Sequence, residues 1–182
     1  MNKQSLRDLY VAELKDIYNA EQQLLKALPK LAKASSSDEL RQAFEAHLEE
    51  TRGQVARLET IFEGMEQSPK GKKCVGMEGL VKEGGEMIEE FEEAVLDAGL
   101  ISAAQRVEHY EIAGYGSVIA YAELIGESDA VSLLQESLAE EEQADRKLTE
   151  LSEGINAKAN AGTEANELGP QVNRKRGTKR AA

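Results

Sequence analysis

Residues 105–116, QRVEHYEIAGYG, carry acidic side chains on a helix face where apolar side chains are expected. A helix face recurs at steps of three and four residues. Around this stretch the face comprises Ile101, Ala104, Glu108, Glu111, Tyr115 and Val118. Glu108 and Glu111 are therefore predicted to point inward. A buried carboxylate is costly unless it has a partner, so these two glutamates require one.

Other segments interrupt an apolar face with acid in the same way. Residues 5–34 give the series Leu14, Ile17, Glu21 and Leu24, and the last long segment gives Leu134, Leu138, Glu141, Asp145 and Leu148. In residues 38–63 the apolar face is uninterrupted, with Phe44, Leu48, Thr51 and Val55. The neighbouring face carries His47, Glu50 and Gln54, which are expected to reach the centre of a bundle only from its edge.

Apolar periodicity predicts four long helices, at residues 5–34, 38–63, 94–125 and about 128–157. Ser5 is a candidate N-cap, Ser36 and Glu39 have the spacing of a capping box, and Gly126 closes the third helix. A turn-rich connection and a short, glycine-weakened helix at residues 77–93 separate the two helical hairpins. One long crossover of this kind gives an all-α, ferritin-like four-helix bundle with a short crossover helix between helices two and three.

Composition limits the partners of the chain. We assign residues 1–160 to one helical domain and residues 161–182, which have almost no large apolar side chains, to a disordered basic tail. The last ten residues carry five basic side chains, whereas residues 1–172 carry 17 basic and 34 acidic ones. We therefore expect no membrane binding, and contact with nucleic acid only weakly, through the tail.

The sequence also predicts a cytoplasmic protein. It has neither a leader-like apolar run behind a basic start nor a run of about 18 apolar residues that could cross a membrane. The single cysteine, Cys74, cannot form an internal disulfide and is expected to be a loop thiol in a reducing compartment.

The inward acids are predicted to lie at one level of the bundle. With a first hairpin turn near residue 35, Glu21 and Glu50 each lie about 15 residues from the turn. With a second turn near residue 127, the midpoint of Glu108 and Glu111 is offset from that of Glu141 and Asp145 by only about 4 Å, at about 1.5 Å per residue. All four long helices thus deliver acid to one place.

Such a cluster needs positive charge, and no Arg or Lys accompanies it on the inward faces. We predict two transition-metal ions, iron or manganese, held by Glu21, His47, Glu50, Glu108, Glu111, Glu141 and Asp145. An oxygen-rich set with one imidazole suits these ions better than structural zinc or calcium. Two alternatives stay open: His47 is either a ligand or a hydrogen-bonding partner of a ligand, and the carboxyl groups are satisfied either by metal or by water, tyrosine and backbone.

Four strings of residues resemble the YciE/YciF family of ferritin-like proteins. They are LRDLYVAELKDIYNAEQQLLKALPKLAKA (6–34), FEAHLEETRGQVARLETIFE (44–63), AAQRVEHYEIAGYG (103–116) and LLQESLAEEEQADRKLTEL (133–151). The resemblance covers about residues 5–157. It implies a stress-associated bacterial protein with a rubrerythrin-like di-metal bundle, commonly a dimer.

The match to the ligand pattern of ferritin-like proteins is uneven. That pattern generally has Glu on the first helix, E-x-x-H on the second, Glu on the third and E-x-x-H on the fourth, and Glu21, Glu108 and Glu111 fit it. On the second helix the order is reversed, because His47 precedes Glu50, and on the fourth Asp145 stands where an imidazole is usual. These departures leave the metal and its redox behaviour open.

Three functions agree with this reading. A di-metal centre that reacts with peroxide or dioxygen would make the chain peroxidase- or catalase-like, and the lack of a rubredoxin-like cysteine quartet means that a peroxidase would need an external electron donor. In a different class, the chain is a non-enzymatic stress or interaction protein whose metal only ties the helices together. Iron handling is the third, although the homodimer that we expect cannot enclose a mineral.

Overall fold

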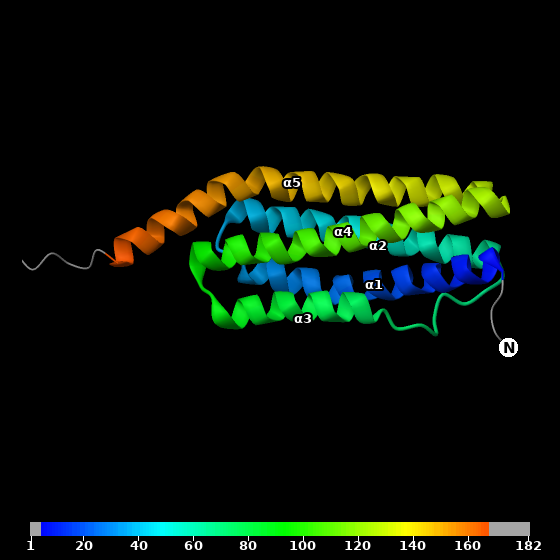
Figure 1. Ribbon diagram of the computed structural model, residues 1–182, viewed down its shortest axis with the longest axis horizontal. Coiled ribbons are helices and arrows are strands. Elements are labelled where there is room, and N and C mark those ends of the chain that lie inside the picture. The colour runs from blue at the N-terminus through cyan, green and yellow to red at the C-terminus, as the bar shows by residue number, and fades with distance from the viewer. Residues whose placement is uncertain (1–4, 168–182) are drawn as a thin grey trace, which may run out of the picture.

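The computed structural model describes residues 5–167, which form five helices. They are α1 (Leu6–Ala34), α2 (Asp38–Gly64), α3 (Val75–Glu90), α4 (Glu93–Ile125) and α5 (Ser128–Glu167). Figure 1 shows α1, α2, α4 and α5 as a long bundle, with the shorter α3 lying along α1 and α4. The connection through α3 carries the chain back along the bundle, so α2 and α4 run in the same direction. The predicted all-α bundle with a crossover helix is confirmed.

Side-chain caps and a glycine define several helix ends. Ser5 Oγ accepts a hydrogen bond from the Asp8 amide, and the Asp8 carboxylate accepts one from the Ser5 amide, so the predicted N-cap of α1 is confirmed. Gly126 ends α4 with a φ of 80°, a left-handed conformation that glycine adopts without strain. The predicted capping box of α2 is wrong, because Ser37 is the N-cap and its hydroxyl accepts from the Leu40 amide.

Ser36 is bound to the second hairpin instead. The Asp97 carboxylate of α4 accepts hydrogen bonds from the Ser36 amide at 2.9 Å, the Ser36 hydroxyl at 2.6 Å and the Ser37 amide at 2.9 Å. Asp97 is buried, so its negative charge depends on these donors. Local spacing could not reveal this contact, because the carboxylate comes from a helix about sixty residues away.

Two further boundaries differ from the sequence prediction. α5 continues to Glu167, well beyond the predicted end near residue 157. A helix that has already formed extends at little cost through alanine-rich sequence, even without apolar residues to bury. The crossover helix α3 begins at Val75, before the predicted start at residue 77. Cys74 is its buried N-cap, and Cys74 Sγ accepts a hydrogen bond from the Met77 amide. Residues 168–182, which include the basic part of the predicted tail, lie outside the described residues.

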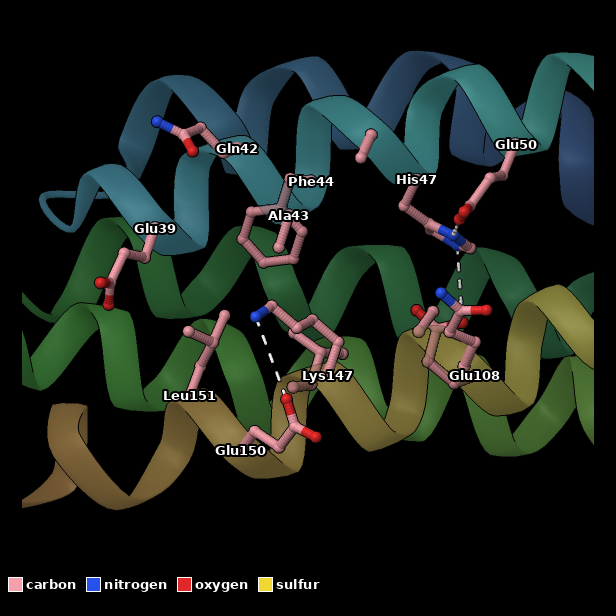
Figure 2. Close-up of a pocket in the computed structure, with 14 residues that line it drawn as sticks. Glu39, Gln42, Ala43, Phe44, His47, Glu50, Glu108, Lys147, Glu150 and Leu151 are labelled. Atoms are coloured by element: carbon pink, nitrogen blue, oxygen red, sulfur yellow. Dashed lines mark hydrogen bonds and ion pairs between the residues drawn. The ribbon is translucent and has the colours of Figure 1, made fainter.

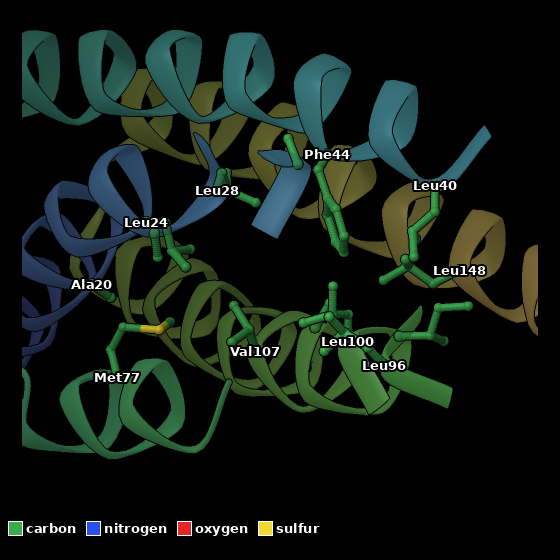
Figure 3. Packing of buried hydrophobic residues seen from close by; sticks show 14 of the residues in the cluster. Ala20, Leu24, Leu28, Leu40, Phe44, Met77, Leu96, Leu100, Val107 and Leu148 are labelled. Carbon is green, nitrogen blue, oxygen red and sulfur yellow. The ribbon is translucent and has the colours of Figure 1, made fainter. Parts of the chain in front are cut away.

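Apolar side chains form two clusters along the bundle, with buried polar side chains between them. The first, which we call the Leu100 cluster, includes Leu24, Leu28, Phe44, Leu100 and Leu148 (Figure 3). The second, the Leu58 cluster, includes Tyr10, Leu14, Leu58, Phe62 and Leu134. Each long helix contributes to both clusters. Among residues 5–167, no helix is long and apolar enough to cross a membrane.

Asp97→Ala is expected to lower the free energy of unfolding by about 2–4 kcal/mol, because two backbone amides and one hydroxyl lose a buried charged acceptor. Urea denaturation measures the change. The matched control is Asp38→Ala in the first turn of α2, since the Asp38 side chain is 80% exposed and pairs with Arg41 on the surface. We expect the control to cost less than about 1 kcal/mol, and equal effects of the two substitutions would contradict the role of Asp97.

Candidate metal centre

Six buried polar side chains meet between the Leu100 and Leu58 clusters. They are Glu21 of α1, His47 and Gln54 of α2, Glu108 and Glu111 of α4, and Glu141 of α5, each at most 5% exposed. On every long helix these residues lie where the chain passes from one apolar cluster to the other. Burial of both clusters therefore brings the polar side chains together.

Four of the six offer ligand atoms to one point. His47, Glu108, Glu111 and Glu141 each present one atom, and these atoms lie within 4.8 Å of one another. His47 Nε2 is 3.5 Å from Glu108 Oε2 and 3.6 Å from Glu141 Oε2, and Figure 2 shows the ring reaching from α2 toward Glu108. Opposite ligands of a transition ion lie about 4 Å apart, so only small movements would let these four surround one.

Glu21 lies beside this group and is held by a tyrosine. The Tyr115 hydroxyl donates to Glu21 Oε1 at 2.5 Å. Burial raises the pKa of both Glu108 and Glu111, and the charge of Glu21 raises them further. Glu21 therefore belongs electrostatically to the same site.

Besides Glu21, two predicted ligands, Glu50 and Asp145, lie outside the group of four. Glu50 is partly exposed, and its Oε2 is 3.2 Å from His47 Nδ1, on the side of the ring away from the other carboxylates. Asp145 accepts from Gln105 Nε2 at 3.1 Å and lies 3.5 Å from His109 Nε2. Asp145 lies one helical turn beyond Glu141. Its carboxylate therefore contacts Gln105 and His109 of α4 and not the four close ligand atoms.

The predicted inward face of α2 is confirmed at Phe44, Thr51 and Val55, which are buried, but the buried surface is wider than predicted. His47 and Gln54 are buried, whereas Leu48, assigned to the apolar face, is only partly buried. The series His47, Thr51, Gln54 and Leu58 has the steps of three and four that mark one helix face, so the signal was present. Sequence reasoning placed Gln54 on the neighbouring face but gave it no role at the site, whereas its Nε2 donates to Glu141 Oε1.

Several buried side-chain atoms of the site have no hydrogen-bond partner and are free to coordinate a metal ion. Among the described residues, buried atoms without a hydrogen-bond partner are Glu21 Oε2, His47 Nε2, Gln54 Oε1, Glu108 Oε2, both oxygens of Glu111, Glu141 Oε2 and, away from this site, the Tyr10 hydroxyl. An unsatisfied buried group costs about 1–3 kcal/mol. Seven such atoms at one place, six of them oxygens and one an imidazole nitrogen, fit the donor preference of iron or manganese.

Comparison with known proteins places the chain in a family. A family model described as a domain of unknown function, DUF892, matches residues 5–161. Protein YciF of Escherichia coli is 49% identical over 162 residues, which is 87% of this chain and 98% of YciF. The chain belongs to the YciE/YciF family.

Solved structures agree with this YciE/YciF fold. The crystal structure of the E. coli stress protein YciF matches with a TM-score of 0.82 and 47% identity, covering 86% of this chain and 99% of that one. YcfI of Rhodopseudomonas palustris matches with a TM-score of 0.78 and 45% identity, over 80% of this chain and 94% of that one. A two-domain protein of Anabaena variabilis with a ferritin-like domain matches at 16% identity and a TM-score of 0.56, over 98% of this chain and 42% of that one, which shows the fold alone.

Burial governs the protonation of the site in this YciE/YciF chain. It raises the pKa of Glu108 to about 8, with further increases from the charges of Glu21 and Asp145. Burial and the neighbouring carboxylates also raise the pKa values of Glu21, Glu111 and Glu141 well above their usual range. For His47 burial lowers the pKa, but the hydrogen bond with Glu50 and the charge of Glu141 outweigh it, so its pKa is raised. Binding of cations would therefore release protons.

Without metal, the free energy of unfolding is expected to fall as pH rises from about 4.5 to about 8. Over this range the folded protein holds more protons than the unfolded chain, because its buried carboxyl groups have raised pKa values. The raised pKa of His47 changes stability in the same direction. Urea denaturation with a chelator present measures the slope, which Glu108→Gln should reduce. A metal-free protein that gains stability across this range would contradict the prediction.

Proposed function

We propose that the chain is a di-metal redox protein that holds iron or manganese and reacts with peroxide or dioxygen. The supporting observation is the group His47, Glu108, Glu111 and Glu141, with Glu21 beside it and unpartnered buried oxygens throughout. E. coli YciF, which is about half identical, is described as a stress protein. Removal of reactive oxygen species would suit such a role.

Each residue has a distinct part in this proposal. His47, Glu108 and Glu141 would hold one ion, and Glu111 and Glu21 would complete the site of the second. Glu50 accepts from His47 Nδ1, which leaves the Nε2 lone pair directed at the ions. Two neighbours orient the carboxylates: Gln54 donates to Glu141, and Tyr115 donates to Glu21.

The chemistry combines the metal pair with apolar packing on both sides of the site along the bundle axis. When bound, two divalent ions would supply two electrons for cleavage of an O–O bond. The Leu100 and Leu58 clusters exclude bulk water from both ends of the site. Tyr115 keeps a proton on its hydroxyl, since burial and the charge of Glu21 raise its pKa well above the usual value. A peroxidase cycle would draw electrons from another protein, whereas a catalase-like cycle needs no donor.

A structural role for the metal is the second function, favoured by the position of the site. The four close ligand atoms come from α2, α4 and α5, in the gap between the two apolar clusters. An ion there would join three helices and neutralise their buried charge.

Glu108→Ala is expected to reduce the bound metal from about two ions per chain and to abolish peroxide consumption, because it removes a ligand that faces both His47 and Glu141. Elemental analysis of protein made in its own host, followed by an anaerobic ferrous or manganous reload and a peroxide assay, tests both effects. The control is Glu142→Ala, whose half-exposed carboxylate pairs with Arg146. A wild-type protein without metal would refute the proposal, and metal without reactivity toward peroxide or dioxygen would favour the structural role.

Glu50→Ala is expected to weaken metal affinity about 10- to 100-fold without removing a ligand, because His47 loses the acceptor that fixes its ring. Competition with a chromogenic chelator measures the affinity. Glu49→Ala is the matched control, because the Glu49 carboxylate is exposed and pairs with Arg52 on the surface of α2. The positioning role of Glu50 predicts that Glu50→Gln retains most of the affinity, and equal losses in Glu50→Ala and Glu49→Ala would rule it out.

A further inference from the structure

A groove of about 540 Å³ lies between α2 and α5 and reaches the metal centre. His47, Glu50 and Glu108 are among its lining residues, so it gives a route from the surface to the candidate ligands. Figure 2 shows Phe44 on one side of the groove and Leu151 and Lys147 on the other, with His47 and Glu108 at one end.

Small side chains keep the groove between α2 and α5 open. Ala43 and Ala46 line it from α2, and Ala144 lines it from α5. Phe44 from α2 and Leu148 from α5, both nearly fully buried, give the groove an apolar floor where it meets the core. Side chains of ordinary length at the three alanines would fill the space between the helices.

The volume of the groove far exceeds the need of the smallest oxidants. A water molecule takes about 30 Å³ of liquid volume, and hydrogen peroxide or dioxygen is of comparable size. Pockets that enclose organic ligands span about 300–1,000 Å³. The groove therefore has the size of a site for an organic molecule, and its apolar floor favours a molecule with an apolar body.

The charge of the groove disfavours an anionic occupant. Four acidic side chains line it: Glu39, Glu50, Glu108 and Glu150. Lys147 is the one lysine or arginine of the lining within the described residues, and its Nζ is 4.0 Å from Glu150. Away from the metal centre the lining has Glu39, Glu50 and Glu150 against Lys147 alone, so a carboxylate or phosphate would meet net negative charge there, whereas a neutral molecule would not.

We propose that this groove binds neutral organic hydroperoxides, with the apolar body against Phe44 and Leu148 and the hydroperoxide group toward His47 and Glu108. This inference rests on the proposed redox function and names its substrate class. The O–O bond would be cleaved with two electrons and two protons, which gives the alcohol and water. In a single turnover a ferrous load is oxidised to ferric and supplies both electrons, and solvent supplies the protons.

Binding is tested first, independently of activity. The full-length protein as purified is titrated with 2-phenylpropan-2-ol, the unreactive alcohol that corresponds to cumene hydroperoxide, in a calorimeter. Ala144→Phe and Ala46→Phe, which fill the groove from opposite helices, should each weaken binding at least tenfold. Ala46 is exposed, so its replacement should not disturb folding. Ala120→Phe, at an exposed position of α4 outside the groove, should bind as the wild type does.

Reactivity is compared next. Ferrous-loaded protein is mixed in single turnover with cumene hydroperoxide or with hydrogen peroxide, and Ala46→Phe should lower the ratio of the first rate to the second at least tenfold. Absence of alcohol binding, binding that both phenylalanine variants retain, or an unchanged ratio would overturn the inference. Reaction with hydrogen peroxide but not with cumene hydroperoxide refutes this inference alone, and reaction with neither of them nor with dioxygen also refutes the proposed function. Sedimentation of the wild type and of Ala46→Phe gives a last check. If the wild type is a dimer and Ala46→Phe is a monomer, the groove is a contact between protomers, which would overturn the inference.

Discussion

The burial of anionic side chains between two apolar clusters is the constraint on which this structure depends. Each long helix carries apolar residues above and below an inward polar position, so the bundle cannot close its cores without enclosing the acids. Water is excluded there, and the carboxyl groups must hold protons or meet cations. The raised pKa values of Glu21, Glu108, Glu111 and Glu141 are the consequence in the absence of metal. The same groups that oppose folding when ionised are the ones that would bind a metal pair.

The two sides of the site differ in ways that matter for reactivity. Glu21 and Glu111 lie fully within the bundle, where Tyr115 supports Glu21 from α4. His47 faces the groove between α2 and α5, and the partly exposed Glu50 holds its outer nitrogen. One side is thus enclosed, while the other is reached from the surface. A substrate that enters the groove would meet the imidazole side first.

Polar contacts between hairpins fix the register that this arrangement needs. Asp97 binds the α1–α2 turn to the start of α4, and Arg57 joins α2 to Ser137, Glu136 and Glu140 of α5. At the crossover, Asn19 accepts from the Cys74 amide and Gln23 donates to the Cys74 carbonyl, which ties α3 to α1. A shift of one helix along the bundle axis would break these contacts together with the common level of the ligands.

The sequence alone determined the four long helices, their hairpin pairing, the crossover and the inward direction of Glu21, Glu108, Glu111 and Glu141, because helical periodicity is a local property that apolar residues record directly. Only the tertiary structure decided how far the buried surface of α2 extends beyond Phe44, Thr51 and Val55, since His47 and Gln54 meet their partners on α4 and α5. It also separated Glu50 and Asp145 from the four close ligands and placed Asp97 at the first turn. The physical reason is the same in each case. Helix rotation and side-chain partners are set by packing between segments distant in the chain, where one helical turn changes which neighbour a carboxylate meets.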